Sequence, residues 1–148
     1  VNLTGAFYGL QAAAEVMIAQ GNGGRIINIA SQAAKSGFPH AQAYSASKHG
    51  LVGLVRSAAI ELGPHGITVN NVCPNHVTTG LGQWQNEHFA ALQGVSVPEY
   101  LARMAARIPL GRPGLPQDTA NAVAFLCSNE AVYVTGESMN VSGGEETH

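Results

Sequence analysis

The pattern of hydrophobic and polar positions divides the chain into alternating helical and extended segments. Residues 3–20 carry apolar side chains at near-helical spacing and end at the glycine-rich sequence 21–24. The segments 25–31 and 67–73 are short, rich in β-branched residues and almost continuously apolar, which is typical of strands buried on both faces. The same reasoning predicts four further helices and a last strand, at 43–62, 80–94, 98–108, 116–128 and 137–144.

The order of these segments predicts an α/β fold. Helix, strand, helix and strand are followed by a helical region at 75–115, then by one more helix and one more strand. Strands separated by helices pair in parallel through crossover connections, so the chain is expected to form the C-terminal part of a doubly wound parallel sheet. In the helix at 116–128, the apolar stripe is expected at Ala120, Val123, Ala124 and Cys127.

Composition limits the classes of partner. The 148 residues are 45% hydrophobic and 11% charged, which is enough for one domain with a core. Formal net charge is −2 and the basic residues are scattered, so neither nucleic acid nor an anionic membrane surface is expected as a partner. No apolar run is long enough to span a bilayer. Small-molecule partners are therefore favoured.

The cysteines and histidines give no sign of a metal site. Cys73 and Cys127 each lie in an apolar segment without CxxC spacing, so both are expected to be buried free thiols. The histidines show no metal-ligand spacing either. Unpaired thiols favour a reducing compartment, and we expect a cytoplasmic protein.

Tyr44 and Lys48 are the strongest candidate chemistry. They lie four residues apart in a predicted helix, which places both side chains on one face. A nearby ammonium group favours the phenolate form of tyrosine, which then becomes a credible general acid and base. A single Tyr-x-x-x-Lys match more often marks a half-exposed helix face. Here, however, Ser31 lies thirteen residues upstream at the end of a strand, and a proline-containing loop at 74–79 follows the next strand.

This order of strand, serine, Tyr-Lys helix, strand and proline loop resembles the short-chain dehydrogenase/reductase family. Members of that family are NAD- or NADP-dependent oxidoreductases built on a Rossmann-type sheet. The resemblance covers the C-terminal part of the family, so residues 1–148 are expected to be an incomplete Rossmann-type domain with a small helical substrate lid at 75–115. It implies hydride transfer between a secondary alcohol and nicotinamide, with the preference for NAD or NADP left open. Residues 75–89 and the tail 140–148 resemble those of polyol or sugar-alcohol dehydrogenases.

The resemblance assigns four catalytic residues. Tyr44 is expected to be the general acid and base, and Ser31 to hydrogen-bond the substrate oxygen. Lys48 is expected to assist Tyr44 and to bind the hydroxyl groups of the nicotinamide ribose. Asn2 is expected to hold a water molecule in a proton relay toward the lysine. Ser31, Lys48 and Asn2 each have a simpler interpretation: a strand-end serine, a solvated lysine, and a polar residue near the first residue of the chain.

Further residues are expected to contact the cofactor or the substrate. By resemblance Asn28 lies beside the cofactor, although a buried asparagine at a strand end is nearly as good an interpretation. The same resemblance implies that Pro74 directs the chain over the nicotinamide, that the backbone of Val77 pairs with the carboxamide, and that Thr79 contacts that amide or the pyrophosphate.

The two residues after Pro74 are expected to lie at the same site. His76 is close enough to touch substrate, or is a neutral surface histidine. Asn75 replaces the family's usual glycine, which is compatible with a turn because asparagine tolerates left-handed backbone conformations.

The nucleotide-binding half of the family is not found in this sequence. Neither GxGxxG nor the looser TGxxxGxG pattern occurs, so no glycine-rich turn is available for a pyrophosphate. The alternative to an enzyme is therefore a truncated, non-catalytic remnant, or an interaction module unable to bind a dinucleotide alone. Either form is expected to associate as a dimer or tetramer through the helices at 3–20 and 43–62.

Overall fold

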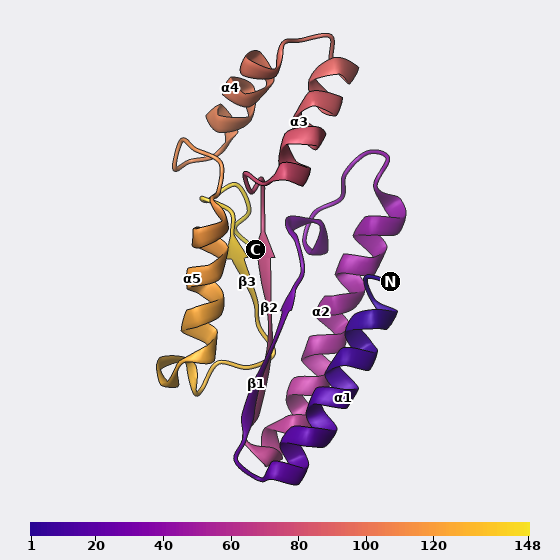
Figure 1. Cartoon of the computed structure of the whole chain (residues 1–148), viewed down its shortest axis with the longest axis vertical. Coiled ribbons are helices and arrows are strands. Elements are labelled where there is room, and N and C mark those ends of the chain that lie inside the picture. The colour runs from indigo at the N-terminus through magenta and orange to yellow at the C-terminus, as the bar shows by residue number, and fades with distance from the viewer.

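The computed structural model describes residues 1–148 apart from the side chain of Leu81. The helices and strands follow the predicted order (Figure 1): α1 Thr4–Gln20, β1 Gly24–Ile29, α2 Gln42–Leu62, β2 Ile67–Pro74, α3 Gly80–Leu92, α4 Val97–Arg107, α5 Pro116–Cys127 and β3 Ser138–Val141. Single 3-10 turns at Gln32–Ala34, Gly63–His65 and Asn129–Ala131 follow β1, α2 and α5. None of the described helices is both long enough and apolar enough to cross a bilayer.

The three strands form one parallel sheet in the order β1-β2-β3. Gly24 of β1 stands opposite Ile67 of β2, and this register continues to Ile29 opposite Val72. β3 pairs with the second half of β2, from Asn71 opposite Ser138 onward. The predicted parallel α/β sheet is therefore confirmed. Because all three strands run the same way, their carboxyl ends lie together at one edge of the sheet, where ligands bind in open α/β folds.

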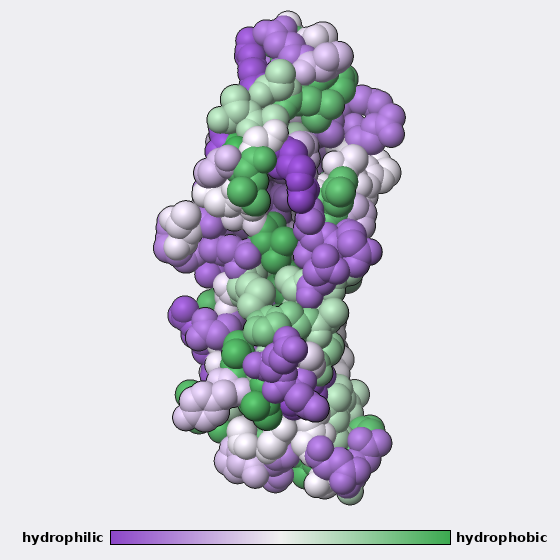
Figure 2. Space-filling model, turned by 90° about the vertical axis from the view of Figure 1, so that its left-hand side faces the viewer, coloured by the Kyte–Doolittle hydropathy of each residue, from purple (hydrophilic) through white to green (hydrophobic). Residues whose placement is uncertain are grey.

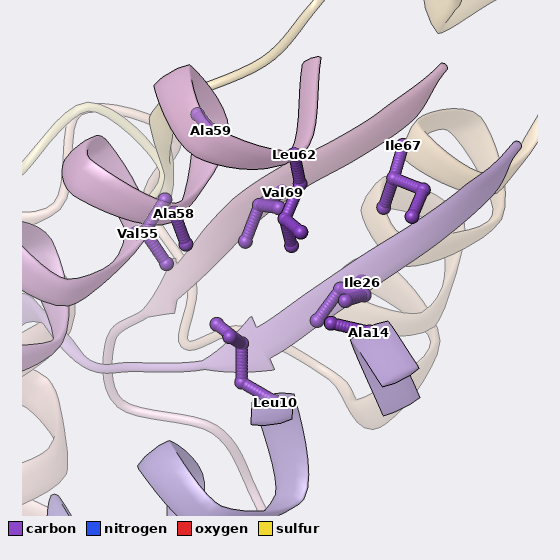
Figure 3. Packing of buried hydrophobic residues seen from close by; sticks show 9 residues of the cluster. All are labelled: Leu10, Ala14, Ile26, Val55, Ala58, Ala59, Leu62, Ile67 and Val69. Atoms are coloured by element: carbon purple, nitrogen blue, oxygen red, sulfur yellow. The ribbon is translucent and has the colours of Figure 1, made fainter. Parts of the chain in front are cut away.

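Helices cover both faces of the sheet. α1 and α2 lie side by side on one face and α5 lies on the other (Figure 1). The largest core cluster joins α1, α2, β1 and β2 (Figure 3): Leu10, Ala14, Ile26, Val55, Ala58, Ala59, Leu62, Ile67 and Val69. Side chains along β2 point alternately to the two faces of the sheet, so this strand contributes to the core on both sides. Val69 faces α2, while Val72 packs against Leu126 of α5.

The prediction that both early strands are buried on both faces holds for β2 but is wrong for β1. Every residue of β2 from Ile67 to Cys73 is buried. In β1 only Ile26 is buried, and Ile29 is 50% exposed. β1 is one of the two outer strands of the described sheet, so one of its edges has no neighbouring strand.

The predicted face of α5 is correct for Val123 but wrong for its other three residues. Leu126 is fully buried, and Ala122 and Val123 pack beside it, whereas Ala120, Ala124 and Cys127 are exposed. The expectation of two buried thiols therefore holds only for Cys73. The buried stripe is rotated slightly about the helix axis from the predicted one. Both stripes are apolar, and only packing against the sheet determines which of them is covered.

α3 and α4 form a helical hairpin beyond the carboxyl edge of the sheet (Figure 1). The rings of Phe89 and Tyr100 stack between the two helices, with centroids 6.5 Å apart. Each helix begins at a side-chain cap, since the Thr79 hydroxyl accepts from the Gly82 N–H and the Ser96 hydroxyl from the Glu99 N–H. This hairpin occupies most of the predicted lid region, and its role as a lid stays a prediction.

Candidate functional site

Tyr44 and Lys48 lie together at the N-terminal end of α2, as their spacing predicts. The Lys48 Nζ atom is 5.8 Å from the centroid of the Tyr44 ring. The same ammonium group donates a hydrogen bond of 2.8 Å to the carbonyl of Ile29, the last residue of β1. Burial lowers the pKa of Lys48, against an opposing effect of the nearby Cys73 thiol. The lysine is thus held between its tyrosine and the sheet edge, while the Tyr44 side chain is 44% exposed.

Ser31 begins the loop that follows β1. Its hydroxyl accepts a hydrogen bond of 3.1 Å from the Ala33 N–H and so caps the short 3-10 turn. Burial outweighs the effects that lower the pKa of the Cys73 thiol, which come from the backbone of Ser31 and from the charges of Lys35 and Lys48. Ser31 and Lys48 therefore flank one buried side chain. Burial raises the pKa of Cys73, which keeps it a neutral thiol between them.

Asn2 lies near Tyr44, linked to it through a chain of two hydrogen bonds. Its amide donates a hydrogen bond of 3.4 Å to the Ser47 hydroxyl, which in turn donates to the Tyr44 carbonyl at 2.7 Å. Asn2 and Tyr44 line an open surface cavity of about 470 Å³ at the start of α1 and α2. The described lining of this cavity includes neither Lys48 nor Ser31, so Asn2 shares a cavity with Tyr44 but not with these two residues.

The loop after Pro74 is held by an isolated bridge to Gly114. The Gly114 N–H donates to the His76 carbonyl at 3.1 Å, and the Thr78 N–H donates to the Gly114 carbonyl at 2.9 Å. In a bridge of this kind the backbone N–H and carbonyl of the central residue, Val77, point away from Gly114. The Val77 carbonyl instead faces the start of α3, since a Cβ atom on Gly82 would lie 2.6 Å from its oxygen, and the Val77 N–H takes no part in the bridge.

The left-handed backbone conformation expected at Asn75 is found at the next residue, His76. The φ of His76 is 41°, and Asn75 is not among the described residues with positive φ. Asn75 is buried instead, and its side-chain amide donates a hydrogen bond of 2.5 Å to the Glu145 carboxylate. The His76 imidazole lies 3.6 Å from the same carboxylate. Burial lowers the pKa of His76, with a raising effect from Glu145 and a lowering one from Arg107.

Asn28 brings a buried, unpartnered donor to the sheet. It stands opposite Asn71 in the β1–β2 register, and its side-chain nitrogen has no hydrogen-bond partner among the described residues. A buried donor without a partner is costly to a protein. This amide is therefore suited to an additional hydrogen-bonding group near the carboxyl end of β1.

Comparison with known proteins identifies the family. The family profile described as enoyl-(acyl carrier protein) reductase matches residues 1–146. A putative ketoacyl reductase of Streptomyces coelicolor is 43% identical over 145 residues, which are 97% of this chain and 55% of the relative. The chain belongs to the short-chain dehydrogenase/reductase family. It spans about half the length of the curated relatives it matches.

Solved structures of short-chain dehydrogenases and reductases share this fold. An actinorhodin polyketide ketoreductase with NADPH aligns with a TM-score of 0.94 at 41% identity, over 100% of this chain and 57% of the ketoreductase. Sorbitol-6-phosphate 2-dehydrogenase from Erwinia amylovora aligns with a TM-score of 0.96 at 36% identity, over 100% of this chain and 58% of the dehydrogenase. The resemblance to the C-terminal part of a Rossmann-type fold is thus confirmed.

In this short-chain dehydrogenase/reductase chain, the sequence pattern does not mark Glu145 as a residue near the candidate site. Glu145 contacts Asn75 and His76 although it lies seventy residues further along the chain than Asn75. It is not part of a periodic element or of a family motif used above. The only available signal was its position directly after Gly143-Gly144 at the end of the last strand.

Proposed function

We propose that the chain forms the substrate-side part of an NAD- or NADP-dependent oxidoreductase acting on secondary alcohols and ketones. The observation that carries this proposal is the Lys48 ammonium, 5.8 Å from the Tyr44 ring, at the carboxyl edge of a parallel sheet. The relatives support it, since their names describe a ketoacyl reductase, a polyketide ketoreductase and a sorbitol-6-phosphate dehydrogenase.

In this proposal the chain's own residues move and hold one proton. The Tyr44 oxygen takes the hydroxyl proton during alcohol oxidation and returns it to the carbonyl oxygen during reduction. Lys48 stabilises the resulting negative charge on Tyr44, and its bond to the Ile29 carbonyl keeps the ammonium group in place. Ser31 donates a hydrogen bond to the substrate oxygen, and Asn2 holds a water molecule beside Tyr44.

The residues at the sheet edge fit a nicotinamide cofactor, which supplies hydride acceptance or donation when bound. The unpartnered Asn28 amide and the backbone N–H of Val77 offer hydrogen bonds to such a group. In this proposal Lys48 binds the ribose hydroxyls, and Pro74, the last residue of β2, directs the loop over the nicotinamide. The Thr79 hydroxyl accepts from Gly82 but keeps its own proton for the carboxamide or pyrophosphate.

A polyol or sugar alcohol is the substrate class that we propose. Sorbitol-6-phosphate 2-dehydrogenase is the structural neighbour that supports this choice, at a TM-score of 0.96. Besides Ser31 and Tyr44, the half-buried His76 imidazole is placed to hydrogen-bond a hydroxyl group. The hairpin of α3 and α4, within the lid region 75–115, would close over such a substrate.

The chain is further proposed to act in the cytoplasm as a homo-oligomer. The buried, unpaired thiol of Cys73 is suited to a reducing compartment. α1 and α2 keep large apolar side chains on their outer surfaces, including Tyr8 at 63%, Val16 at 56% and Ile60 at 81% exposure. The α5 side also exposes apolar residues in several places along its length (Figure 2), so the outer surface of α1 and α2 is not unique in this respect.

One observation favours the second candidate, a non-catalytic interaction module. The outer edge of β1 has no strand beside it in the described sheet, and Ile29 at its end is half exposed. Such an edge pairs readily with another strand. In that case the chain would associate with partners without binding a dinucleotide.

Cofactor binding and turnover separate the two candidates. We would compare the 148-residue chain with a chimera in which the N-terminal portion of the Erwinia amylovora dehydrogenase precedes Val1. The chimera is expected to bind NAD or NADP by fluorescence titration and to reduce it in the presence of sorbitol or sorbitol 6-phosphate. A folded chimera that binds neither cofactor, while the parent dehydrogenase does, would support the interaction module instead.

A further inference from the structure

Residues 142–148 turn back from β3 across the carboxyl edge of the sheet (Figure 1). Gly143 and Gly144 have φ values of 64° and 93°, a region that favours glycine. A Cβ atom on Gly143 would lie 2.6 Å from the Ile108 side chain, and the Leu110 N–H donates to the Gly143 carbonyl at 3.1 Å. The turn is therefore packed closely against the segment that follows α4.

Glu145 links this tail to two other parts of the chain. One carboxylate oxygen accepts from the Asn75 amide at 2.5 Å and lies 3.6 Å from the His76 imidazole. The other lies 3.3 Å from Nε of Arg107, the last residue of α4. The Glu145 side chain is only 16% exposed, so these contacts are shielded from water. One carboxylate thus joins the loop after β2 to the base of the helical hairpin.

Glu146 makes the corresponding link to the loop after β1. Its carboxylate is buried and accepts a hydrogen bond from the Ser36 hydroxyl. This bond lowers the pKa of Glu146, although desolvation raises it. Lys35 adds a second contact, since its ammonium group donates to the His148 carbonyl at 3.0 Å. Both partners belong to the short loop that begins at Ser31.

We propose that residues 142–148 position the two loops of the candidate site. In this proposal Glu145 fixes the loop of Asn75 and His76 together with the α4 end, while Glu146 fixes the loop that begins at Ser31. Both are positioning residues, because they act through the loops they hold. The proposal rests on the proposed function only in so far as these loops are assigned to cofactor and substrate. Hydrogen bonds to shielded carboxylates are strong enough to hold a loop.

Amide hydrogen exchange of the 148-residue chain tests the two links separately. Glu145→Gln keeps the size of the side chain but removes its charge, and exchange at 75–79 is expected to rise about tenfold or more. Glu146→Gln should raise exchange at 32–36 by a similar factor. Each variant should leave the other loop unchanged. Glu61→Gln, on the exposed surface of α2, is the matched control and should change neither loop.

The titration of His76 provides a readout that a merely structural tail would not produce. Glu145 and Arg107 are the charged groups that face this imidazole in the described structure. Glu145→Gln removes a charge that raises the pKa of His76, so its titration followed by NMR should shift to lower pH. Arg107→Gln removes a charge that lowers this pKa, so the shift should be to higher pH. General loosening would move both variants in the same direction.

Several results would overturn the proposal. These are unchanged exchange in both loops, an increase spread evenly over the chain, or titration shifts of the same sign in both variants. If Glu146→Gln does not fold, Ser36→Ala removes the same hydrogen bond and must raise exchange at 32–36. None of these measurements needs cofactor or turnover, so an inactive chimera would count against the proposed function alone. In an active chimera, Glu145→Gln is expected to raise KM more than it lowers kcat.

Discussion

At the scale of single residues, the geometry gives Lys48 two partners at once. Its ammonium group is bound to the Ile29 carbonyl and also lies beside the Tyr44 ring. A lysine anchored to the sheet loses little further freedom when charge develops on its neighbour. The exposed tyrosine hydroxyl remains accessible to a small molecule. The arrangement of Lys48 beside Tyr44 depends on their four-residue spacing, which places both side chains on one face of α2.

Tyr44→Phe is expected to remove the proton donor while leaving the aromatic ring in place. In the active chimera, kcat should fall by about a hundred- to ten-thousand-fold, the usual contribution of a general acid or base. Cofactor affinity should stay nearly constant, since the ring and Lys48 remain. Steady-state kinetics and fluorescence titration provide the two measurements.

Tyr133→Phe is the matched control for this substitution. Tyr133 is 99% exposed after the last 3-10 turn, and its loss of a hydroxyl group should leave turnover unaltered. Turnover retained in Tyr44→Phe would refute the assignment of proton transfer to Tyr44. Equal losses in both variants would point to a general effect on folding.

The two thiols are expected to differ sharply in reactivity. Cys73 is 1% exposed and burial raises its pKa, so little thiolate is available to react. Cys127 lies on the exposed face of α5. With 5,5′-dithiobis(2-nitrobenzoate), the native chain should release one equivalent quickly and the second only on unfolding. Cys127→Ser should abolish the fast phase, and a fast reaction at Cys73 would contradict the buried position.

At the scale of elements, β2 is the strand on which both layers depend, and its two asparagines show how polar groups are buried there. Asn70 donates to the Val134 carbonyl at 2.8 Å and accepts from the Glu137 N–H at 3.0 Å. Asn71 donates to the Leu51 carbonyl of α2 at 3.2 Å. The strand is thereby tied to the segment before β3 on one side and to α2 on the other. Buried amides need such partners.

Leu126→Ala is expected to destabilise the fold by about 2–5 kcal/mol, the usual range for a buried leucine. Leu126 is fully buried between Val72 and Ala131, so its truncation leaves a cavity between α5 and the sheet. Leu92→Ala, at a position 68% exposed on α3, should change stability by less than about 0.5 kcal/mol. Urea unfolding followed by circular dichroism compares the two. Similar losses in both would mean that α5 is not docked through Leu126.

The hydrophobic pattern predicted the order of the elements and the parallel sheet because these depend on local periodicity. The pairing of Tyr44 with Lys48 followed from spacing alone. The face of α5 did not, since two apolar stripes compete on that helix and only the sheet selects Leu126 over Cys127. The contacts of Glu145 with Asn75 and His76 were also out of reach. They join residues far apart in sequence and follow from a turn at two glycines that carries no periodic signal.

At the scale of the whole molecule, the described chain presents a three-stranded sheet with helices on both faces and two outer strands, β1 and β3, each with one unpaired edge. Relatives about twice as long contain the same fold within a larger one. Apolar residues remain on the outer surface of α1 and α2 in the isolated chain. Both features favour association, by strand pairing at β1 or by helix packing through α1 and α2. The two routes bury different residues and can be separated.

Val16→Glu and Ile60→Glu test the helix route. Val16 and Ile60 are 56% and 81% exposed on α1 and α2, so a glutamate at either position is tolerated by the folded chain. At a helix interface it would place an unpaired charge in a desolvated contact, and association should weaken by about tenfold or more. Analytical ultracentrifugation over a concentration series measures this change.

Leu92→Glu is the matched control, because it adds the same charge on α3, outside the proposed interface. Weakened association in Val16→Glu and Ile60→Glu but not in Leu92→Glu would assign the contact to α1 and α2. Unchanged association in all three variants would contradict the helix interface and shift attention to the free edge of β1. There the half-exposed Ile29 is the residue to change to lysine, since charged side chains at an edge oppose strand pairing.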